Sequence, residues 1–95
     1  MALDFEWDAR KAAANRAKHG VTFDEAATVF ADPLGHLADD PRHSLAEQRV
    51  VLLGRSHRGR LLAVMFTERG PVVRLISARR ATRHERQAYE AGPPR

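Results

Sequence analysis

Arginine and histidine side chains are concentrated in one short stretch, residues 76–86. Its arginine and histidine residues are Arg79, Arg80, Arg83, His84 and Arg86. An apolar strand-like run precedes them and a helical pattern follows, so the stretch spans a strand-to-helix junction. A helix N-terminus already carries partial positive charge and unpaired N–H groups. Further cations repel that dipole unless an anion lies among them, and we therefore predict a phosphate-binding site here.

A local pattern marks where the helix of this junction begins. Thr82 is followed three residues later by Glu85, the spacing of a capping box, in which each side chain bonds to a backbone N–H of the first turn. There is a structural alternative to the phosphate site. It is an ion pair between Arg79 or Arg83 and a carboxylate, for which the candidates are Glu47 and Glu85.

An arginine-rich site of this kind could cleave RNA without a metal ion or a thiol. The 2′-hydroxyl of RNA is itself the nucleophile, so the protein need only remove its proton, stabilise the charge on five-coordinate phosphorus and assist the leaving 5′-oxygen. Two or three Arg side chains can supply the charge stabilisation, and a His, Glu or Tyr can handle the protons. The same residues would equally support binding of nucleic acid without turnover.

The charge of the chain is unevenly distributed. Residues 1–40 contain 4 Lys or Arg and 8 Asp or Glu, a balance of −4, whereas residues 41–95 contain 12 Arg and 4 Glu, a balance of +8. Of the 16 basic residues, 14 are Arg, whose planar fork fits a phosphate. This favours a polyanionic partner such as nucleic acid. The alternative is a solvated basic surface in an organism whose high-GC codons replace Lys by Arg.

Length and composition restrict the class of protein. Ninety-five residues, 43% of them hydrophobic, suit one domain over residues 1–95 with a single modest core. The absence of cysteine argues against disulfides and thiolate metal sites. The first ten residues are too acidic for a signal peptide, and the longest apolar run, Leu61 to Phe66, is too short to span a membrane. We expect a soluble cytoplasmic protein with no membrane partner.

We predict no metal site and no cofactor. Asp39, Asp40 and His43 lie close together in the sequence, but no fourth ligand stands at a supporting spacing. The Asp40-Pro41 pair is better explained as turn chemistry.

The N-terminal residues predict a strand and a helix. Residues 3–7 alternate apolar and acidic side chains, as in a strand with one buried face. Asp8 is a suitable N-cap for a helix over residues 9–18, and Gly20 is placed to end it. Lys18 and His19 lie at its end, where cations suit the negative helix terminus. That placement is a sufficient structural explanation of His19, and a functional role is the alternative.

A second helix is expected directly afterwards. Thr22 and Glu25 form another capping box, and Asp32-Pro33 closes the helix because the residue before proline avoids the helical region. One face of this helix is apolar, with the spacing i, i+3, i+4 and i+7; its members are Phe23, Ala26, Ala27 and Phe30.

The C-terminal half predicts three strands, over residues 47–55, 60–68 and 72–79. Short Gly-containing turns connect them, which indicates an antiparallel meander. A weaker pattern over residues 34–38 indicates an edge strand, and a last helix is expected over residues 83–90. The fold class is therefore α+β. It comprises an antiparallel sheet, formed by the meander with the N-terminal strand and the edge strand, two N-terminal helices and one C-terminal helix.

Residue parity relates two arginines of this sheet. Arg49 has the parity of Val51, and Arg79 has the parity of Leu75. Since alternate residues of a strand share a face, Arg49 and Arg79 could project from one face of the sheet.

A series of short motifs extends from residue 5 to residue 90, and in order and spacing it resembles the BrnT family, the ribonuclease toxins of BrnT/BrnA toxin–antitoxin pairs. Ala9 stands where these proteins often have proline, and Gln48 where they often have glutamate. Neither departure touches the predicted chemistry. The matching pieces are Phe5-Glu6-Trp7-Asp8, Lys11, Asn15, Lys18-His19-Gly20-Val21, Phe23-Asp24-Glu25-Ala26, Val29-Phe30-Ala31-Asp32-Pro33, His43-Ser44, Glu47-Gln48-Arg49, Gly54, Val64-Met65-Phe66-Thr67, Ile76-Ser77-Ala78-Arg79, Ala81-Thr82-Arg83, Glu85-Arg86 and Tyr89-Glu90.

The resemblance implies a RelE-like α+β fold and an endoribonuclease that inhibits translation. It also implies two kinds of partner besides RNA. One is a BrnA-type antitoxin that neutralises the toxin, and the other is operator DNA, which would be contacted only through the toxin–antitoxin complex.

The resemblance also implies roles for individual residues. Arg79 and Arg83 match the C-terminal motif and are assigned to phosphate and transition-state contacts, with Arg49 as a third candidate. His19 matches the Lys-His-Gly motif and could be base or acid. Tyr89 matches the final motif, and a C-terminal tyrosine can be catalytic in RelE-like folds, although a packing role is the stronger alternative. Further RNA contacts are expected from Lys18, His43, Arg80 and His84.

Two other function classes stay open at this point. The arginine cluster would also suit a non-catalytic nucleic-acid-binding protein, which salt-sensitive binding without cleavage would reveal. An apolar sheet face beside a basic surface would suit a protein-interaction module with an acidic partner.

Overall fold

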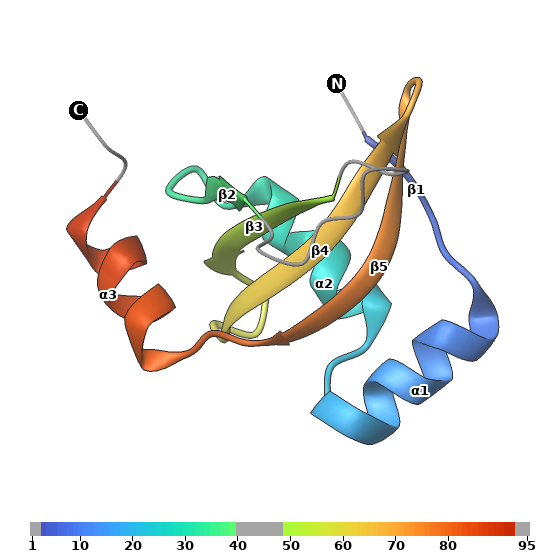
Figure 1. Ribbon diagram of the computed structural model, residues 1–95, viewed down its shortest axis with the longest axis horizontal. Helices are drawn as coiled ribbons and strands as arrows, with labels where there is room; N and C mark the ends of the chain where they lie inside the picture. The colour runs from blue at the N-terminus through green and yellow to red at the C-terminus, as the bar shows by residue number, and fades with distance from the viewer. Residues whose placement is uncertain (1–2, 40–48, 93–95) are drawn as a thin grey trace.

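The computed structural model describes residues 3–39 and 49–92 (Figure 1). Three α-helices, one short 3₁₀ helix and five strands are present in this part of the chain, which confirms the α+β prediction. No helix of the described residues is long and apolar enough to cross a membrane. The elements in chain order are β1 (Asp4–Glu6), α1 (Ala9–His19), α2 (Phe23–Thr28), η1 (Val29–Ala31), β2 (His36–Asp39), β3 (Val50–Arg55), β4 (Leu61–Arg69), β5 (Val72–Arg80) and α3 (Arg83–Ala91).

The five strands form one sheet in the order β1-β5-β4-β3-β2. The predicted meander is confirmed: β3 pairs antiparallel with β4, and β4 with β5. The predicted edge strand is β2, antiparallel to β3. The sheet is mixed, however, because the N-terminal strand β1 lies parallel to β5. That pairing joins segments almost seventy residues apart, and alternation within either segment carries no information about it.

The register of β4 and β5 shifts at Met65/Phe66. On the β5 side, Ser77 pairs with Met65 and Leu75 pairs with Phe66, so Ile76 is the extra residue of a bulge. A bulge reverses the alternation of side chains along the strand. The parity argument linking Arg79 to Leu75 is therefore wrong: Leu75 lies on the face covered by α1 and α2, and Arg79 lies on the other.

The main core lies between α1, α2 and one face of the sheet (Figure 1). Aromatic side chains connect these elements edge to face, an arrangement that their ring quadrupoles favour. Phe30 contacts Phe5 with ring centroids 5.1 Å apart and Phe66 with centroids 5.0 Å apart. Trp7 contacts Phe23 at 5.9 Å. These aromatics are core residues, as the apolar spacing of the second helix predicts.

The predicted helix ends are largely confirmed. The Asp8 side chain accepts from two backbone N–H groups at the start of α1, and Gly20 ends the helix with φ 69°, a left-handed conformation that favours glycine. Thr22 caps α2. That helix is shorter than predicted, because the chain tightens into η1 before Asp32, where the extended backbone begins.

The face of the sheet opposite α1 and α2 has a smaller apolar cluster. Val51, Leu53 and Ala63 are buried there, and Met65 is half-buried beside them. The register places Ala63 opposite Arg79 and Leu53 opposite His36, so Arg79 lies on this second face. α3 leaves the end of β5 and contacts β3.

Candidate functional site

The predicted strand-to-helix junction is formed by the end of β5 and the start of α3. Thr82 Oγ1 accepts a hydrogen bond from Glu85 N at 3.1 Å, and Glu85 Oε1 accepts one from Thr82 N at 2.8 Å. Both halves of the predicted capping box are therefore present. A cap of this kind stabilises a helix by about 1 kcal/mol. It sets the orientation of α3 as the helix leaves the sheet.

Arg79 and Glu85 form a two-pronged ion pair at this junction. Arg79 Nη1 donates to Glu85 Oε1 at 2.6 Å, and Arg79 Nη2 donates to Glu85 Oε2 at 3.0 Å. The Arg79 hydrogen bonds, with a smaller contribution from Thr82, hold the pKa of Glu85 below its usual value of 4.5. The structure thus contains one of the ion pairs that the sequence offers as an alternative to a phosphate site. Both side chains keep some exposure, 31% for Arg79 and 20% for Glu85.

The other cations of the junction are exposed. Arg80, Arg83, His84 and Arg86 all lie on the surface, and within the described residues none of them forms an ion pair. The first N–H groups of α3, those of Arg83 and His84, have no intrahelical acceptor, which is the property that lets a helix start bind an anion. Successive helical residues are rotated by about 100°, so Arg83 and Glu85 leave α3 on roughly opposite sides. The structure does not bring Arg83 beside the Arg79–Glu85 pair.

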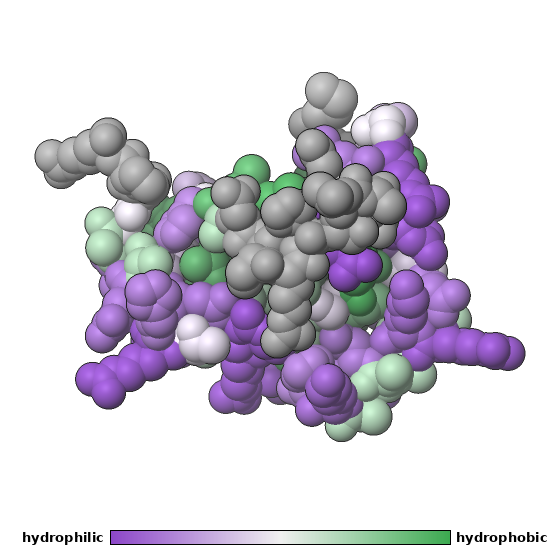
Figure 2. Space-filling model, in the orientation of Figure 1, coloured by the Kyte–Doolittle hydropathy of each residue, from purple (hydrophilic) through white to green (hydrophobic). Residues whose placement is uncertain are grey.

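Two other segments are joined to the junction by hydrogen bonds. Ala81 N donates to Leu61 O at 3.0 Å. The neighbouring Arg60 donates through Nη2 to Gly20 O at 3.1 Å, directly after Lys18 and His19. The end of α1, the β3–β4 turn and the β5–α3 junction therefore meet at one end of the molecule, the lower edge in Figure 1. Hydrophilic side chains line this edge (Figure 2).

Asn15 connects α1 to the strand that leads into the junction. Its side-chain nitrogen donates to Val21 O at 2.9 Å and to Ala78 O at 2.8 Å, and its side-chain oxygen accepts from Ala78 N at 3.0 Å. Asn15 is only 6% exposed, so these bonds satisfy backbone groups that would be costly to leave unpaired. The residue after Ala78 is Arg79, and its backbone position therefore depends on α1.

The chain matches the model of a known protein family. A family model described as "Ribonuclease toxin, BrnT, of type II toxin-antitoxin system" matches residues 7–85. The chain belongs to the BrnT family. Membership implies an antitoxin partner and an RNA target. No curated protein matches the chain.

A solved structure shows the BrnT fold independently. The chain resembles the crystal structure of the Brucella abortus ribonuclease toxin, BrnT, with a TM-score of 0.66 and 22% sequence identity. The match covers 86% of this chain and 100% of the Brucella chain. At this identity the likeness establishes the fold alone, and the RelE-like description stays a prediction.

The side chain of Tyr89 in this BrnT-family chain contacts Asp32, His36 and Arg55. Its hydroxyl donates to Asp32 Oδ2 at 2.7 Å, and its ring stacks on His36 with centroids 6.2 Å apart. The Arg55 guanidinium lies over the same ring, 5.5 Å from its centroid. Burial and the bond to Asp32 raise the pKa of Tyr89 above 10.0. These contacts favour the packing interpretation, in which Tyr89 anchors α3 to the sheet.

Arg49, a further predicted site residue, is not adjacent to Arg79 in the sheet. Arg49 is half-buried and directly precedes β3. Across the sheet, Leu53 pairs with Ala63, and Ala63 pairs with Arg79. Arg49 comes four residues before Leu53 in the chain, or about 13 Å of strand. His43 and the proposed ion-pair partner Glu47 lie outside the described residues.

The BrnT-family chain contains a buried ion pair, Glu25–Arg60, that the sequence does not predict. Glu25, 3% exposed, bonds through Oε1 to Arg60 Nη2, and its Oε2 accepts from Arg60 Nε at 2.8 Å and from Ser56 Oγ at 2.7 Å. The hydrogen bonds from Arg60, and with them the one from Ser56, lower the pKa of Glu25 from 4.5 to about 2. The sequence marks Glu25 only as a capping residue, and no local pattern connects it to Arg60.

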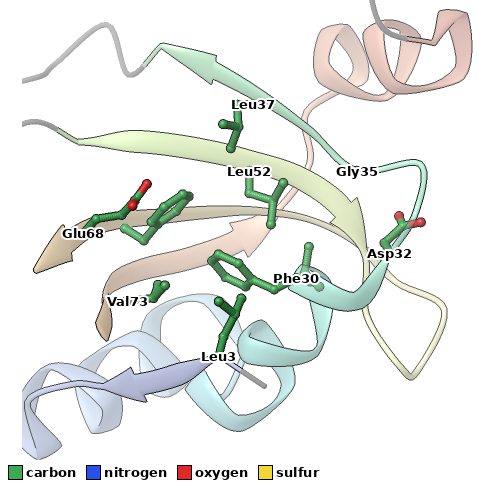
Figure 3. A pocket seen from close by; sticks show the side chains of 10 residues that line it. Leu3, Phe30, Asp32, Gly35, Leu37, Leu52, Glu68 and Val73 are labelled. Carbon is green, nitrogen blue, oxygen red and sulfur yellow. The ribbon is translucent and has the colours of Figure 1, made fainter. Parts of the chain in front are cut away.

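A pocket of about 280 Å³ extends from Glu68 and Val73 to Asp32, which lies beside the end of β3 (Figure 3). Its floor is apolar, and Leu3, Phe30 and Leu37 line it with their side chains. Its charged residues are the carboxylates Asp32 and Glu68; none of the described lining residues is Lys, Arg or His. A phosphate would be repelled there. The exposed basic end, formed by Arg80, Arg83, His84 and Arg86 at the start of α3, is the better candidate for contact with RNA. No metal-binding group of three or more His, Asp or Glu is present among the described residues.

Proposed function

We propose that this BrnT-family toxin is a metal-independent endoribonuclease whose active site is the β5–α3 junction. The observation that carries the proposal is the set of cations around the start of α3 in a chain whose family is described as ribonuclease toxins. Arg79 would contact the scissile phosphate and stabilise its developing charge. Arg80 and Arg83, exposed on either side of the capping box, would bind neighbouring phosphates, together with His84.

The end of α1 extends this surface. Lys18 and His19 lie beside the segment that the Arg60–Gly20 bond ties to the junction, and we propose that they contact the same RNA. His19 is half-buried and remains a candidate acid or base. Arg49 and His43 are kept as candidate RNA contacts on the family resemblance, and Tyr89 as a catalytic candidate whose contacts favour packing.

The consequences for the cell follow from the same proposal. Cleavage of cellular RNA would inhibit translation, and a BrnA-type antitoxin would neutralise the toxin by covering the basic end. Contact with operator DNA would occur only through that complex. An acidic antitoxin segment would match the charge of the exposed arginines.

Purified protein incubated with RNA in excess EDTA tests the proposal. We expect cleavage that leaves 2′,3′-cyclic phosphate ends, because the 2′-hydroxyl is the nucleophile. Arg79→Ala should reduce the rate by at least about 10²-fold, the effect of losing one donor that stabilises a developing anion. A thermal melt of the variant checks that α3 still folds once the ion pair is lost.

Arg10→Ala is the matched control for loss of positive charge. Arg10 is exposed in the first turn of α1, at the opposite end of that helix from His19, and its removal should leave the rate unchanged. Salt-sensitive binding of RNA with no cleavage, on free RNA and on translating ribosomes alike, would contradict the ribonuclease and support the binding module.

A further inference from the structure

Glu85 is the one carboxylate among the cations at the start of α3 within the described residues. Its charged neighbours are Arg79 and Arg80 from β5 and, on α3 itself, His84 and Arg86. A carboxylate offers about four lone-pair positions to hydrogen-bond donors. Among the described residues, Arg79 Nη1 and Thr82 N donate to Oε1, and Arg79 Nη2 donates to Oε2. Oε2 accepts fewer of these bonds than Oε1 and is the oxygen more open to a further donor.

Hydrogen bonds from Arg79 and Thr82 fix the position of the Glu85 carboxylate. Arg79 fixes both oxygens from one side, and the capping bond to Thr82 fixes the side chain against the helix start. Exposure of 20% leaves the carboxylate reachable from solvent. Because Arg79 would contact the scissile phosphate, a ribose attached to that phosphate would lie within reach of the same carboxylate.

We propose that Glu85 is the general base of the reaction, taking the proton of the RNA 2′-hydroxyl on Oε2. The inference rests on the proposed ribonuclease function and adds a catalytic residue to it. A helix cap needs a carboxylate or an amide at this position equally, so the cap by itself does not require the charge. The ion pair with Arg79 uses the charge, and a base that takes the proton would use it as well.

The step balances without a metal or an added reagent. Oε2 removes the 2′-hydroxyl proton as the 2′-oxygen bonds to phosphorus, and the bond from phosphorus to the 5′-oxygen breaks. The 5′-oxygen takes a proton from water or from a protonated histidine, giving a 5′-hydroxyl and a 2′,3′-cyclic phosphate. The proton on Glu85 then returns to solvent. Arg79 stabilises the negative charge on the phosphoryl oxygens throughout.

Glu85→Gln separates this role from the structural one. Glutamine keeps the shape of the side chain and can complete the capping box, whereas Arg79 loses its charged partner. A thermal melt therefore checks that α3 still folds in the variant. General bases contribute about 10²–10⁴-fold to rates, and we expect a loss of that size in EDTA. Glu90→Gln is the matched control, since Glu90 is exposed on the same helix, and it should cleave at the wild-type rate.

Two further readouts exclude an effect that acts only through displaced Arg79. If Glu85 is the base, the residual rate of Glu85→Gln should rise about tenfold per pH unit, since hydroxide replaces the carboxylate. Binding of a non-cleavable 2′-deoxy oligonucleotide should stay within about twofold of wild type. Loss of that binding with an unchanged pH profile would instead show that Glu85 only positions Arg79, and would overturn the proposal.

The wild-type protein provides a test that needs no variant. Its kcat/KM should stay constant as the pH is lowered to 4.5 and should fall tenfold per pH unit only below the pKa of Glu85, which Arg79 holds under 4.5. A fall that begins above pH 4.5 would assign the base to another group and would overturn the inference. Wild-type cleavage with full activity of Glu85→Gln would refute the base and leave the ribonuclease standing, whereas no cleavage by wild type would refute both.

Discussion

At the scale of single residues, the candidate site and the anchor of its helix use different side chains of α3. Glu85 and Tyr89 are four residues apart and share the helix face that meets the sheet. Glu85 bonds to Arg79, whereas Tyr89 bonds to Asp32. One helix therefore presents an ion pair at its start and a buried hydroxyl near its end, and the two can be tested separately.

Tyr89→Phe should lower stability and spare activity. The substitution removes the hydrogen bond to ionised Asp32 and keeps the ring between His36 and Arg55. Hydrogen bonds to charged groups contribute about 1.5–3 kcal/mol, and urea unfolding should show a loss of this order. RNA cleavage should remain within about twofold of wild type. A hundredfold drop in cleavage at unchanged stability would instead identify Tyr89 as catalytic.

Glu25 should make the stability of the fold sensitive to acid. Its pKa is lowered from 4.5 to about 2 in the folded chain, so its contribution to stability is complete above pH 4.5 and is lost as the pH falls toward 2. We expect the free energy of unfolding, measured with urea, to drop by up to about 3 kcal/mol over that range through this group.

Two variants isolate the contribution of Glu25. Glu25→Gln should be less stable at pH 7, because Arg60 loses its charged partner, and should show a flatter pH dependence between pH 5 and 3. Glu90→Gln, an exposed control, should retain the wild-type slope. An equally steep slope in Glu25→Gln would show that other carboxylates dominate acid unfolding.

At the scale of elements, the helices are positioned by close contacts with the sheet. η1 packs on β3 at Gly54, where an added Cβ would lie 2.8 Å from Val29 Cγ1 and 3.2 Å from Asp32 Oδ2. The missing side chain therefore lets η1 approach the strand. That approach brings Asp32 to the Arg55 N–H at 2.8 Å and to the Tyr89 hydroxyl.

Gly54→Ala should destabilise the chain, and Val29→Ala should partly relieve the effect. Overpacking of this kind costs about 1–3 kcal/mol, because η1 must shift away from β3. Val29→Ala alone should also destabilise, since Val29 is fully buried. In the double variant the two losses should sum to less than their separate values, with a coupling of about 0.5–3 kcal/mol. Strict additivity in urea unfolding would show that the close contact is not the cause.

At the scale of the whole molecule, the exposed arginines and the pocket differ in the charge of the residues that line them. The end of α1, the β3–β4 turn and the start of α3 meet at the basic end, whereas the pocket of Figure 3 is lined by apolar and acidic residues. A polyanion would therefore approach from one direction, and the strength of its binding should depend on salt.

The logarithm of the RNA-binding constant should fall linearly with the logarithm of the salt concentration. For single-stranded nucleic acid, each lost phosphate contact reduces the steepness of this line by about 0.7. Arg80→Ala and Arg83→Ala should each reduce the slope by about that amount, measured with a non-cleavable oligonucleotide at several salt concentrations. Arg10→Ala should leave it unchanged. Equal reductions in all three variants would place the RNA on a diffuse surface instead of the junction.

Residue types alone predicted the features that depend on neighbouring residues. The caps at Asp8 and Thr22, the capping box at Thr82 and the Gly20 stop are read from residue types a few positions apart, because the bonds they make close within one helical turn. The meander follows from short turns between apolar runs. The Arg79–Glu85 pair, six residues apart, was available from sequence as one of two alternatives for the junction.

The relations between distant segments became visible only in the folded chain. The parallel pairing of β1 with β5, the pairing of Glu25 with Arg60 and the bond from Tyr89 to Asp32 join residues 35 to 68 positions apart, and no local pattern encodes such distances. The bulge at Ile76 moved Arg79 to the face opposite Leu75. A single extra residue reverses side-chain alternation, so the face on which the candidate catalytic arginine lies was settled by strand register, which depends on packing across the whole sheet.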